Sequence, residues 1–152
     1  MLLSELLPPA RIRIPLAGRS KDELLRELVD VLHATGEVKD SPGVLRAVQE
    51  REEVLSTGIG NGVAIPHGKS PQVSSLAMAA GVAAEPVDFD ALDGKPVNLF
   101  FLLVGPESAA GDHVKALSRI SRLVRSDSFR QRLAAASSAE EFHAIVSEAE
   151  QA

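Results

Sequence analysis

The sequence predicts a single domain of the α/β class over residues 1–152, in which helices and strands alternate along the chain. The length is that of one typical domain of about 150 residues. Residues 97–104 form a continuous apolar run, which is typical of a strand whose sheet is covered by helices on both faces. Segments with apolar residues at helical spacing lie on both sides of this run.

Two helices are expected in the first third of the chain. Ser20 and Glu23 form a capping box that opens the first helix, and Gly36 ends it. The second helix starts at a Ser-Pro pair, with Pro42 as its first helical residue, and runs into the charged residues 50–53.

Strands are expected before and after these helices. Alternating apolar residues over 12–16 predict an early strand. The glycine-rich residues 56–71 cannot form a long helix, and their apolar members indicate extended chain between turns. The small apolar residues 76–84 predict a buried strand, and a turn at 93–94 leads into the apolar strand 97–104.

Three further helices are expected after the apolar strand. Asp112 caps the first, whose apolar residues over 114–124 face the core. A shorter helix follows at 129–135. Ser138 and Glu141 form a second capping box, which opens the last helix.

The composition excludes several classes of function. With 21 Asp and Glu against 16 Lys and Arg, the net charge of −5 argues against non-specific binding of nucleic acid. The absence of Cys excludes disulfides, thiolate metal sites and Cys nucleophiles. The chain has neither Trp nor Tyr and five Phe, so stacking platforms for sugars or bases are scarce.

The N-terminal apolar stretch does not resemble a secretory signal. Ser4 and Glu5 interrupt it, Pro8 and Pro9 stop it, and no basic region precedes it. The longest apolar run, around residues 97–104, is less than half of a membrane span. We therefore expect a cytoplasmic protein that does not insert into a membrane.

The glycine-rich segment fails two phosphate-binding fingerprints. Five residues separate Gly62 from the Gly68-Lys69-Ser70 triplet, one more than a P-loop allows. The dinucleotide fingerprint fails as well, because Val63 stands where its last glycine is required. The glycines either turn backbone N–H groups toward an anion or simply make turns.

His67 is the leading candidate for chemistry. It stands between Pro66, which stiffens the chain, and Gly68, which permits a close approach to the backbone. A neutral imidazole held in this way can attack a phosphoryl group. The alternative is a turn histidine without a role.

Two other residues suit an anion site, and neither is specific by itself. His113 lies in the first turn of a predicted helix, where a neutral ring could donate to a phosphate, or it is a half-exposed helix residue. Arg51 could neutralise phosphoryl charge or pair with a neighbouring Glu. We assign His33 and His143 to structure, and no spacing indicates a metal site.

Taken together, these segments resemble a known family. Arg51-Glu52 followed by STGIGNGVAIPHGK over residues 56–69 is similar to the signature of enzyme IIA components of the phosphoenolpyruvate-dependent phosphotransferase system. The similarity is to the fructose/mannitol class, which is type 2. Residues 89–97 and the pair Asp112-His113 also match, so the resemblance extends from Leu2 to about Val146.

The resemblance implies a mixed sheet flanked by helices, with His67 in a cleft at the strand ends. It implies that His67 accepts a phosphoryl group on Nε2 from HPr or a nitrogen-type HPr. His113 would contact the phosphate, Arg51 would stabilise its charge, and Thr57 would help to orient His67 or the phosphoryl group. The family usually has Leu where this chain has Val114, a conservative change.

Two subtypes fit the resemblance, together with one alternative of another class. The N-terminal segment and the PHGKS segment look like those of the nitrogen type, which regulates partners according to its phosphorylation state. The other subtype passes phosphate to the IIB domain of a sugar permease, and a non-catalytic binding module is the third reading. No cofactor and no direct sugar binding are expected, and the rim around His67 should be apolar and acidic.

Overall fold

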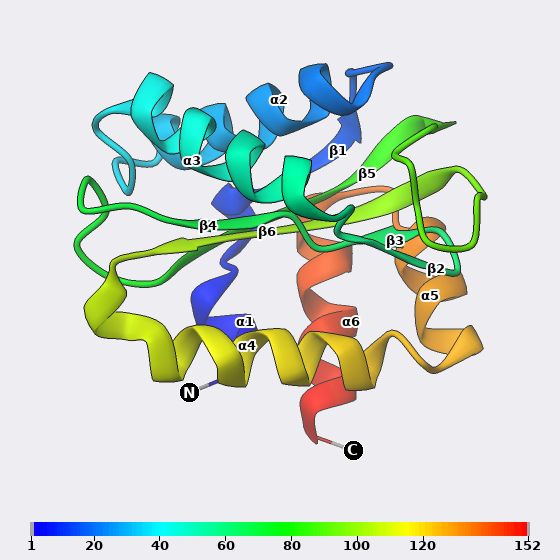
Figure 1. The fold of residues 1–152 in the computed structure, drawn as a ribbon. Coiled ribbons are helices and arrows are strands. Elements are labelled where there is room, and N and C mark those ends of the chain that lie inside the picture. The colour runs from blue at the N-terminus through cyan, green and yellow to red at the C-terminus, as the bar shows by residue number, and fades with distance from the viewer. Residues whose placement is uncertain (1, 152) are drawn as a thin grey trace.

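Two long antiparallel strands, β5 (Ala77–Val87) and β6 (Val97–Gly105), form the centre of the fold. Both are buried over most of their length, because helices cover each face of the sheet (Figure 1). This confirms the two buried strands that the apolar runs predict, although β5 continues past the expected end at residue 84. The computed structural model describes residues 2–151.

Four shorter strands complete a mixed sheet with the order β1-β5-β6-β3-β2, in which β4 also pairs with β6. β1 (Ile12–Leu16) is parallel to β5, as β3 (Val63–Ala64) and β4 (His67–Lys69) are to β6. β2 (Gly58–Gly60) is antiparallel to β3. The mixed sheet and the extended glycine-rich segment are therefore confirmed.

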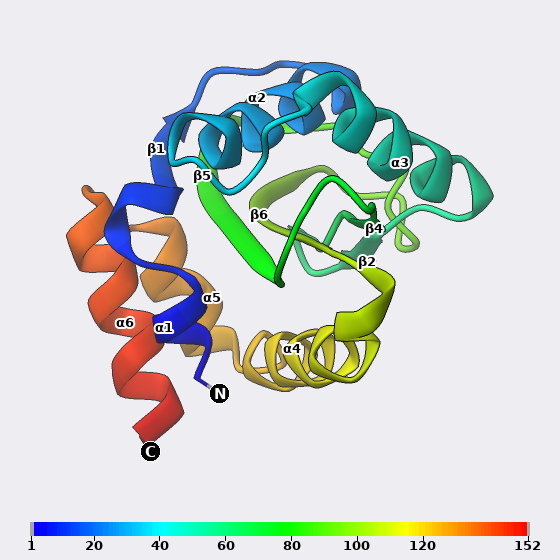
Figure 2. The same cartoon turned by 90° about the vertical axis from the view of Figure 1, so that its left-hand side faces the viewer.

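The helices form two layers, one on each face of the sheet (Figures 1 and 2). One layer consists of α2 (Lys21–Ala34) and α3 (Ser41–Val54). The other contains α1 (Leu3–Leu6), α4 (Ala110–Leu123), α5 (Asp127–Ala134) and α6 (Ala139–Gln151). Two short 3-10 helices, η1 (Pro9–Arg11) and η2 (Glu107–Ala109), precede β1 and α4.

Alternate side chains of β6 divide the interior into two cores, one for each helix layer. Phe100, Leu102 and Val104 are buried with the side chains of α2 and α3. Leu99 and Phe101, on the opposite face, are buried with α1, α4, α5 and α6. This period of two explains why the run reads as continuously apolar, since neither face of the strand meets water.

The predicted capping hydroxyls are confirmed, but other details of the helix starts differ from the prediction. The hydroxyls of Ser20 and Ser138 accept the backbone N–H groups of Glu23 and Glu141, as predicted. The Glu23 and Glu141 carboxylates, however, accept the N–H groups of Arg19 and Ser137, so neither predicted capping box is completed. Helix α3 begins one residue earlier than expected, because the Asp40 carboxylate is its cap, which moves Pro42 to the second helical position.

The predicted start of α4 is wrong, and so is the burial expected for Val114. The turn η2 leads directly into α4, so Asp112 lies inside the helix and does not cap it. Ile120 and Val124 are buried as expected, whereas Val114 is 65% exposed and His113 is buried. Within residues 2–151, no helix has both the length and the apolarity needed to cross a membrane.

Gly81→Ala should destabilise the protein by about 1–3 kcal/mol, because a Cβ there would overlap the Arg13 carbonyl oxygen of the neighbouring strand β1. Gly111→Ala is the matched control: its Cβ would meet nothing within 4 Å. The control should change stability by less than about 1 kcal/mol, in the stabilising direction. Urea unfolding of both variants measures the difference, and equal effects would contradict the close packing of β1 on β5.

Candidate functional site

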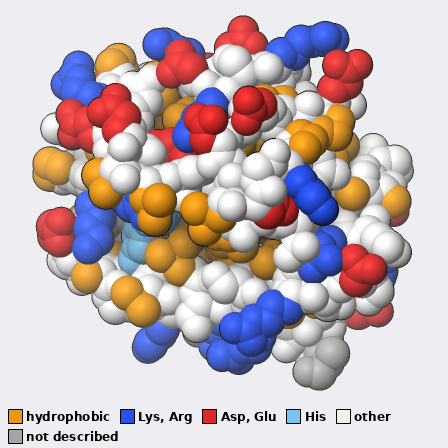
Figure 3. All heavy atoms as spheres, turned by 45° about the vertical axis from the view of Figure 1, so that its right-hand side comes forward, with side chains coloured by type: hydrophobic (Ala, Val, Ile, Leu, Met, Phe, Trp, Pro, Cys, Tyr) orange, Lys and Arg blue, Asp and Glu red, His pale blue; other side chains and the backbone are white. Residues whose placement is uncertain are grey.

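Side chains from three elements line an open hollow of about 430 Å³ at the end of β6. His67 and Lys69 come from β4, Arg51 from α3 and His113 from α4. The remaining lining residues are small or apolar: Ala47, Gly68, Ala110, Val114 and Leu117. Figure 3 shows histidine in a surface hollow bordered by hydrophobic side chains.

The register of β4 on β6 brings these residues together. His67 pairs with Leu103, whose side chain lies in the core on the α4 side of the sheet. Gly68 is turned to the other side, where a Cβ would lie 3.1 Å from the backbone nitrogen of Val48. Because Gly68 has no side chain, α3 packs close to β4, and Arg51 in its last turn reaches the hollow past the edge of the sheet.

The ring of His67 is held in one tautomer. Its Nδ1 lies 2.9 Å from the carbonyl oxygen of Ile65. A carbonyl can only accept, so Nδ1 carries the proton and Nε2 keeps a free lone pair. Burial lowers the pKa of His67, and the bond to Ile65 opposes this only in part. The neutral, nucleophilic form therefore dominates at pH 7.

His113 stands beside His67, with the ring centroids 5.5 Å apart and the ring planes at 70°. It is 4% exposed, and its Nε2 has no hydrogen-bond partner within residues 2–151. Burial, followed by repulsion from His67 and Lys69, lowers the pKa of His113 to about 4. A neutral ring with an unpartnered buried nitrogen is unusual, and such an atom calls for a partner from outside the chain.

The two cations of the hollow, Arg51 and Lys69, differ in their partners. Arg51 donates to the carbonyl oxygen of Leu55 at 2.9 Å and forms no ion pair within residues 2–151, so the alternative of an Arg–Glu pair is not found. Lys69 is 3.7 Å from the exposed Glu107. The expected acidic rim is wrong, since the charged residues that line the hollow are basic. Of the two acidic residues adjacent to Arg51 in the sequence, Glu50 is exposed and Glu52 pairs with Lys21.

Thr57 does not line the hollow. It is buried, its hydroxyl donates to the Glu52 carboxylate, and its carbonyl oxygen accepts the N–H of Ile65 at 3.0 Å. Sequence reasoning assigned no role to Lys69, although its spacing of two from His67 places both on one side of a strand. Once the segment is known to be a strand, this spacing predicts that Lys69 lies on the same side as His67.

The other two histidines lie outside the hollow, and each donates to a backbone carbonyl. His33 Nδ1 is 2.8 Å from the oxygen of Val38, and His143 Nε2 is 3.0 Å from that of Ser4. Both contacts are the structural roles expected for them. Within residues 2–151, no three His, Asp or Glu residues are grouped to hold a metal ion.

The comparison with known families decides the assignment. Residues 5–149 match the family described as "Phosphoenolpyruvate-dependent sugar phosphotransferase system, EIIA 2". The chain belongs to this EIIA family. Its members transfer phosphoryl groups, a chemistry that suits an imidazole nucleophile among basic side chains.

Relatives of this EIIA chain include nitrogen regulatory proteins and fructose-specific components. A nitrogen regulatory protein of Bradyrhizobium diazoefficiens is 36% identical over 147 residues, covering 96% of this chain and 95% of that protein. A fructose-specific EIIABC component of Bacillus subtilis is 37% identical over 138 residues, covering 91% of this chain but 22% of that longer protein. The crystal structure of IIA-Ntr from Neisseria meningitidis matches with a TM-score of 0.88 at 39% identity, covering 95% and 98% of the two chains.

The free energy of unfolding should fall by about 2 kcal/mol between pH 7 and pH 5 through His113 alone. Over this range the unfolded chain, with a His pKa near 6.5, binds a proton that the folded EIIA chain, with a pKa of about 4, does not. The stability that the folded state gains from its neutral His113 is complete above pH 6.5 and is lost as the pH falls toward 4. Urea unfolding at the two pH values should show a smaller loss in His113→Asn; an equal loss in both proteins would contradict this assignment.

Proposed function

We propose that this EIIA chain is a histidine phosphocarrier that accepts a phosphoryl group from HPr, or a nitrogen-type HPr, on Nε2 of His67. The observation that supports this best is the hydrogen bond from His67 Nδ1 to Ile65, which leaves Nε2 unprotonated in a ring that lines the basic hollow. Transfer between two histidines needs alignment and charge stabilisation more than covalent work by the protein.

The transfer step forms one P–N bond and breaks another. The lone pair of His67 Nε2 attacks phosphorus, the P–N bond to the donor histidine breaks, and its electron pair returns to the donor ring. Positive charge develops in the His67 ring, where the Nδ1–H bond to the Ile65 carbonyl stabilises it. Arg51 and Lys69 offset the charge of the phosphoryl oxygens, and the unpartnered Nε2 of His113 would donate to one of them.

For the role of the phosphorylated protein, we favour the nitrogen-regulatory type. Proteins with that name are similar to this chain over almost their entire length. A phosphoryl group on His67 would place negative charge inside an apolar, basic hollow, so partner proteins could distinguish the two states of this surface. We place this activity in the cytoplasm, where phosphoenolpyruvate is available.

A second function is favoured by the fructose-specific relatives of Bacillus subtilis and Haloferax volcanii. In that case the phosphoryl group passes from His67 to the IIB domain of a fructose/mannitol-type permease. The two functions use the same chemistry at His67 and differ in the partner that meets the hollow. Neither requires this chain to bind a sugar.

Incubation with phosphoenolpyruvate, enzyme I and HPr should add one phosphoryl group to the chain, as measured by intact mass. His67→Ala should remain unmodified, whereas His143→Ala, away from the hollow, should be modified like the wild type. Label that persists in His67→Ala would overturn the assignment of the nucleophile. If the wild type takes no phosphoryl group while a control IIA does, the chain is a binding module.

Arg51→Gln should slow phosphoryl transfer by roughly 10²- to 10³-fold, because a charge-stabilising donor is lost at the transition state. Arg51→Lys should recover little of the rate, since an ammonium lacks the planar donor pair of a guanidinium. Rapid-quench kinetics with phosphorylated HPr measures both, and thermal unfolding checks that the variants are folded. A rate within threefold of the wild type in Arg51→Gln would remove Arg51 from the site.

Pull-downs with His67→Ala and His67→Asp should separate the two functions. A regulatory protein should retain different partner proteins with the neutral and the negatively charged residue. Retention of a permease IIB domain by either variant, with no other partner, would favour the sugar-uptake function instead.

A further inference from the structure

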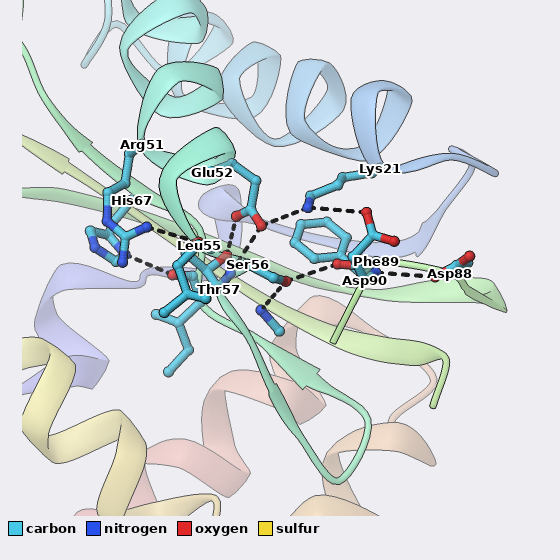
Figure 4. Close-up of polar contacts among 12 residues, drawn as sticks. Lys21, Arg51, Glu52, Leu55, Ser56, Thr57, His67, Asp88, Phe89 and Asp90 are labelled. Carbon is cyan, nitrogen blue, oxygen red and sulfur yellow. Dashed lines mark hydrogen bonds and ion pairs between the residues drawn. The ribbon is translucent and has the colours of Figure 1, made fainter. Parts of the chain in front are cut away.

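We propose that Glu52 is a positioning residue for His67, an inference that rests on the proposed function of His67. The Glu52 side chain is 4% exposed and uses both carboxylate oxygens. Oε2 accepts the backbone N–H of Thr57 at 2.9 Å, and Oε1 accepts the Thr57 hydroxyl. Glu52 therefore ties the last turn of α3 to the segment that leads into β2 (Figure 4).

A continuous series of hydrogen bonds leads from this carboxylate to the reacting ring. Glu52 holds Thr57 through two bonds. The carbonyl oxygen of Thr57 accepts the N–H of Ile65 at 3.0 Å. The carbonyl oxygen of Ile65 then accepts Nδ1–H of His67 at 2.9 Å, the bond that leaves Nε2 free. A shift of Thr57 would thus move the acceptor that selects the tautomer of His67.

Lys21 supports the charge on Glu52. Its Nζ lies 2.8 Å from Glu52 Oε2, 3.6 Å from Asp90 and 4.9 Å from the centre of the Phe89 ring. A buried carboxylate requires such a partner, because burial of an unpaired charge is costly. An ionised Glu52 can accept both Thr57 bonds at once, which a neutral amide cannot do with both of its terminal atoms.

The same anchor lies next to the cation of the hollow. Arg51 precedes Glu52 in the last turn of α3, and its guanidinium is held by the carbonyl oxygen of Leu55. The bonds from Arg51 to Leu55 and from Glu52 to Thr57 both bridge the end of this helix. Glu52 therefore positions the nucleophile on one side of the hollow and steadies the segment that carries Arg51.

Glu52→Gln should change both the ring of His67 and the rate of transfer. Without two acceptors at residue 52, Thr57 and Ile65 shift, and the His67 ring is released from its single tautomer. The ¹⁵N spectrum of the unphosphorylated imidazole should then show a mixture of Nδ1–H and Nε2–H forms. Transfer from phosphorylated HPr should slow roughly 10- to 100-fold, as expected for loss of alignment.

Glu150 offers a matched control on the opposite layer of the protein. Its side chain is also 4% exposed, it lies 3.8 Å from Arg119, and its carboxylate accepts the N–H groups of Leu3 and Ser4. Glu150→Gln should therefore cost stability in the same way, while the tautomer of His67 and the transfer rate stay as in the wild type. Urea unfolding of both variants measures their losses of stability, so that their transfer rates can be compared at a similar loss.

If Glu52→Gln does not fold, Thr57→Val and Thr57→Ser test the same hydrogen bond from its other end. The valine loses the hydroxyl bond to Glu52 and should shift the His67 spectrum, whereas the serine keeps that bond and should restore it. A wild-type spectrum and rate in Glu52→Gln, or an equal slowing in Glu150→Gln, would overturn the proposal. If the wild type accepts no phosphoryl group at His67, the proposed function fails, and the imidazole spectra still decide whether Glu52 positions the ring.

Discussion

The pairing of β4 with the end of β6 is the contact on which the site depends. It sets His67 opposite Leu103, and it turns Gly68 toward α3, where only a residue without a side chain allows the helix to pack so closely. The same strand β6 leads through η2 into α4, which brings His113 to the other wall. Residues from three distant parts of the sequence therefore meet because one short strand is held in one register.

The electrostatics of the hollow differ from those of the chain as a whole. The net charge is −5, yet the ionised side chains that line the hollow are Arg51 and Lys69. Burial keeps both histidines neutral, so one can act as a nucleophile and the other can donate to an anion. Glu52, which follows Arg51, is buried behind the site, where it contacts Lys21 and Thr57. A basic, neutral-histidine hollow on an acidic protein is suited to receiving a phosphoryl group.

Most of the fold could be predicted because its signals are local. The capping residues, the apolar stripes and the continuous apolar run of β6 each depend on neighbours within a few positions. The start of α4 could not, because a 3-10 turn leads into the helix ahead of Asp112, and the 65% exposure of Val114 depends on what packs against the helix. The acidic rim failed for a related reason, since net charge does not say which side chains face a particular hollow.

The sequence by itself determined the class of fold, the family resemblance and the identity of His67, His113 and Arg51 as candidates, because these are carried by periodicity and by a contiguous motif. Only the tertiary structure decided which nitrogen of His67 is free, that Lys69 joins the hollow, and that Thr57 lies behind it beside Glu52. These features arise from hydrogen bonds and burial between segments that spacing along the chain does not specify. The chemistry of each residue is local, whereas its tautomer, its pKa and its partners belong to the assembled fold.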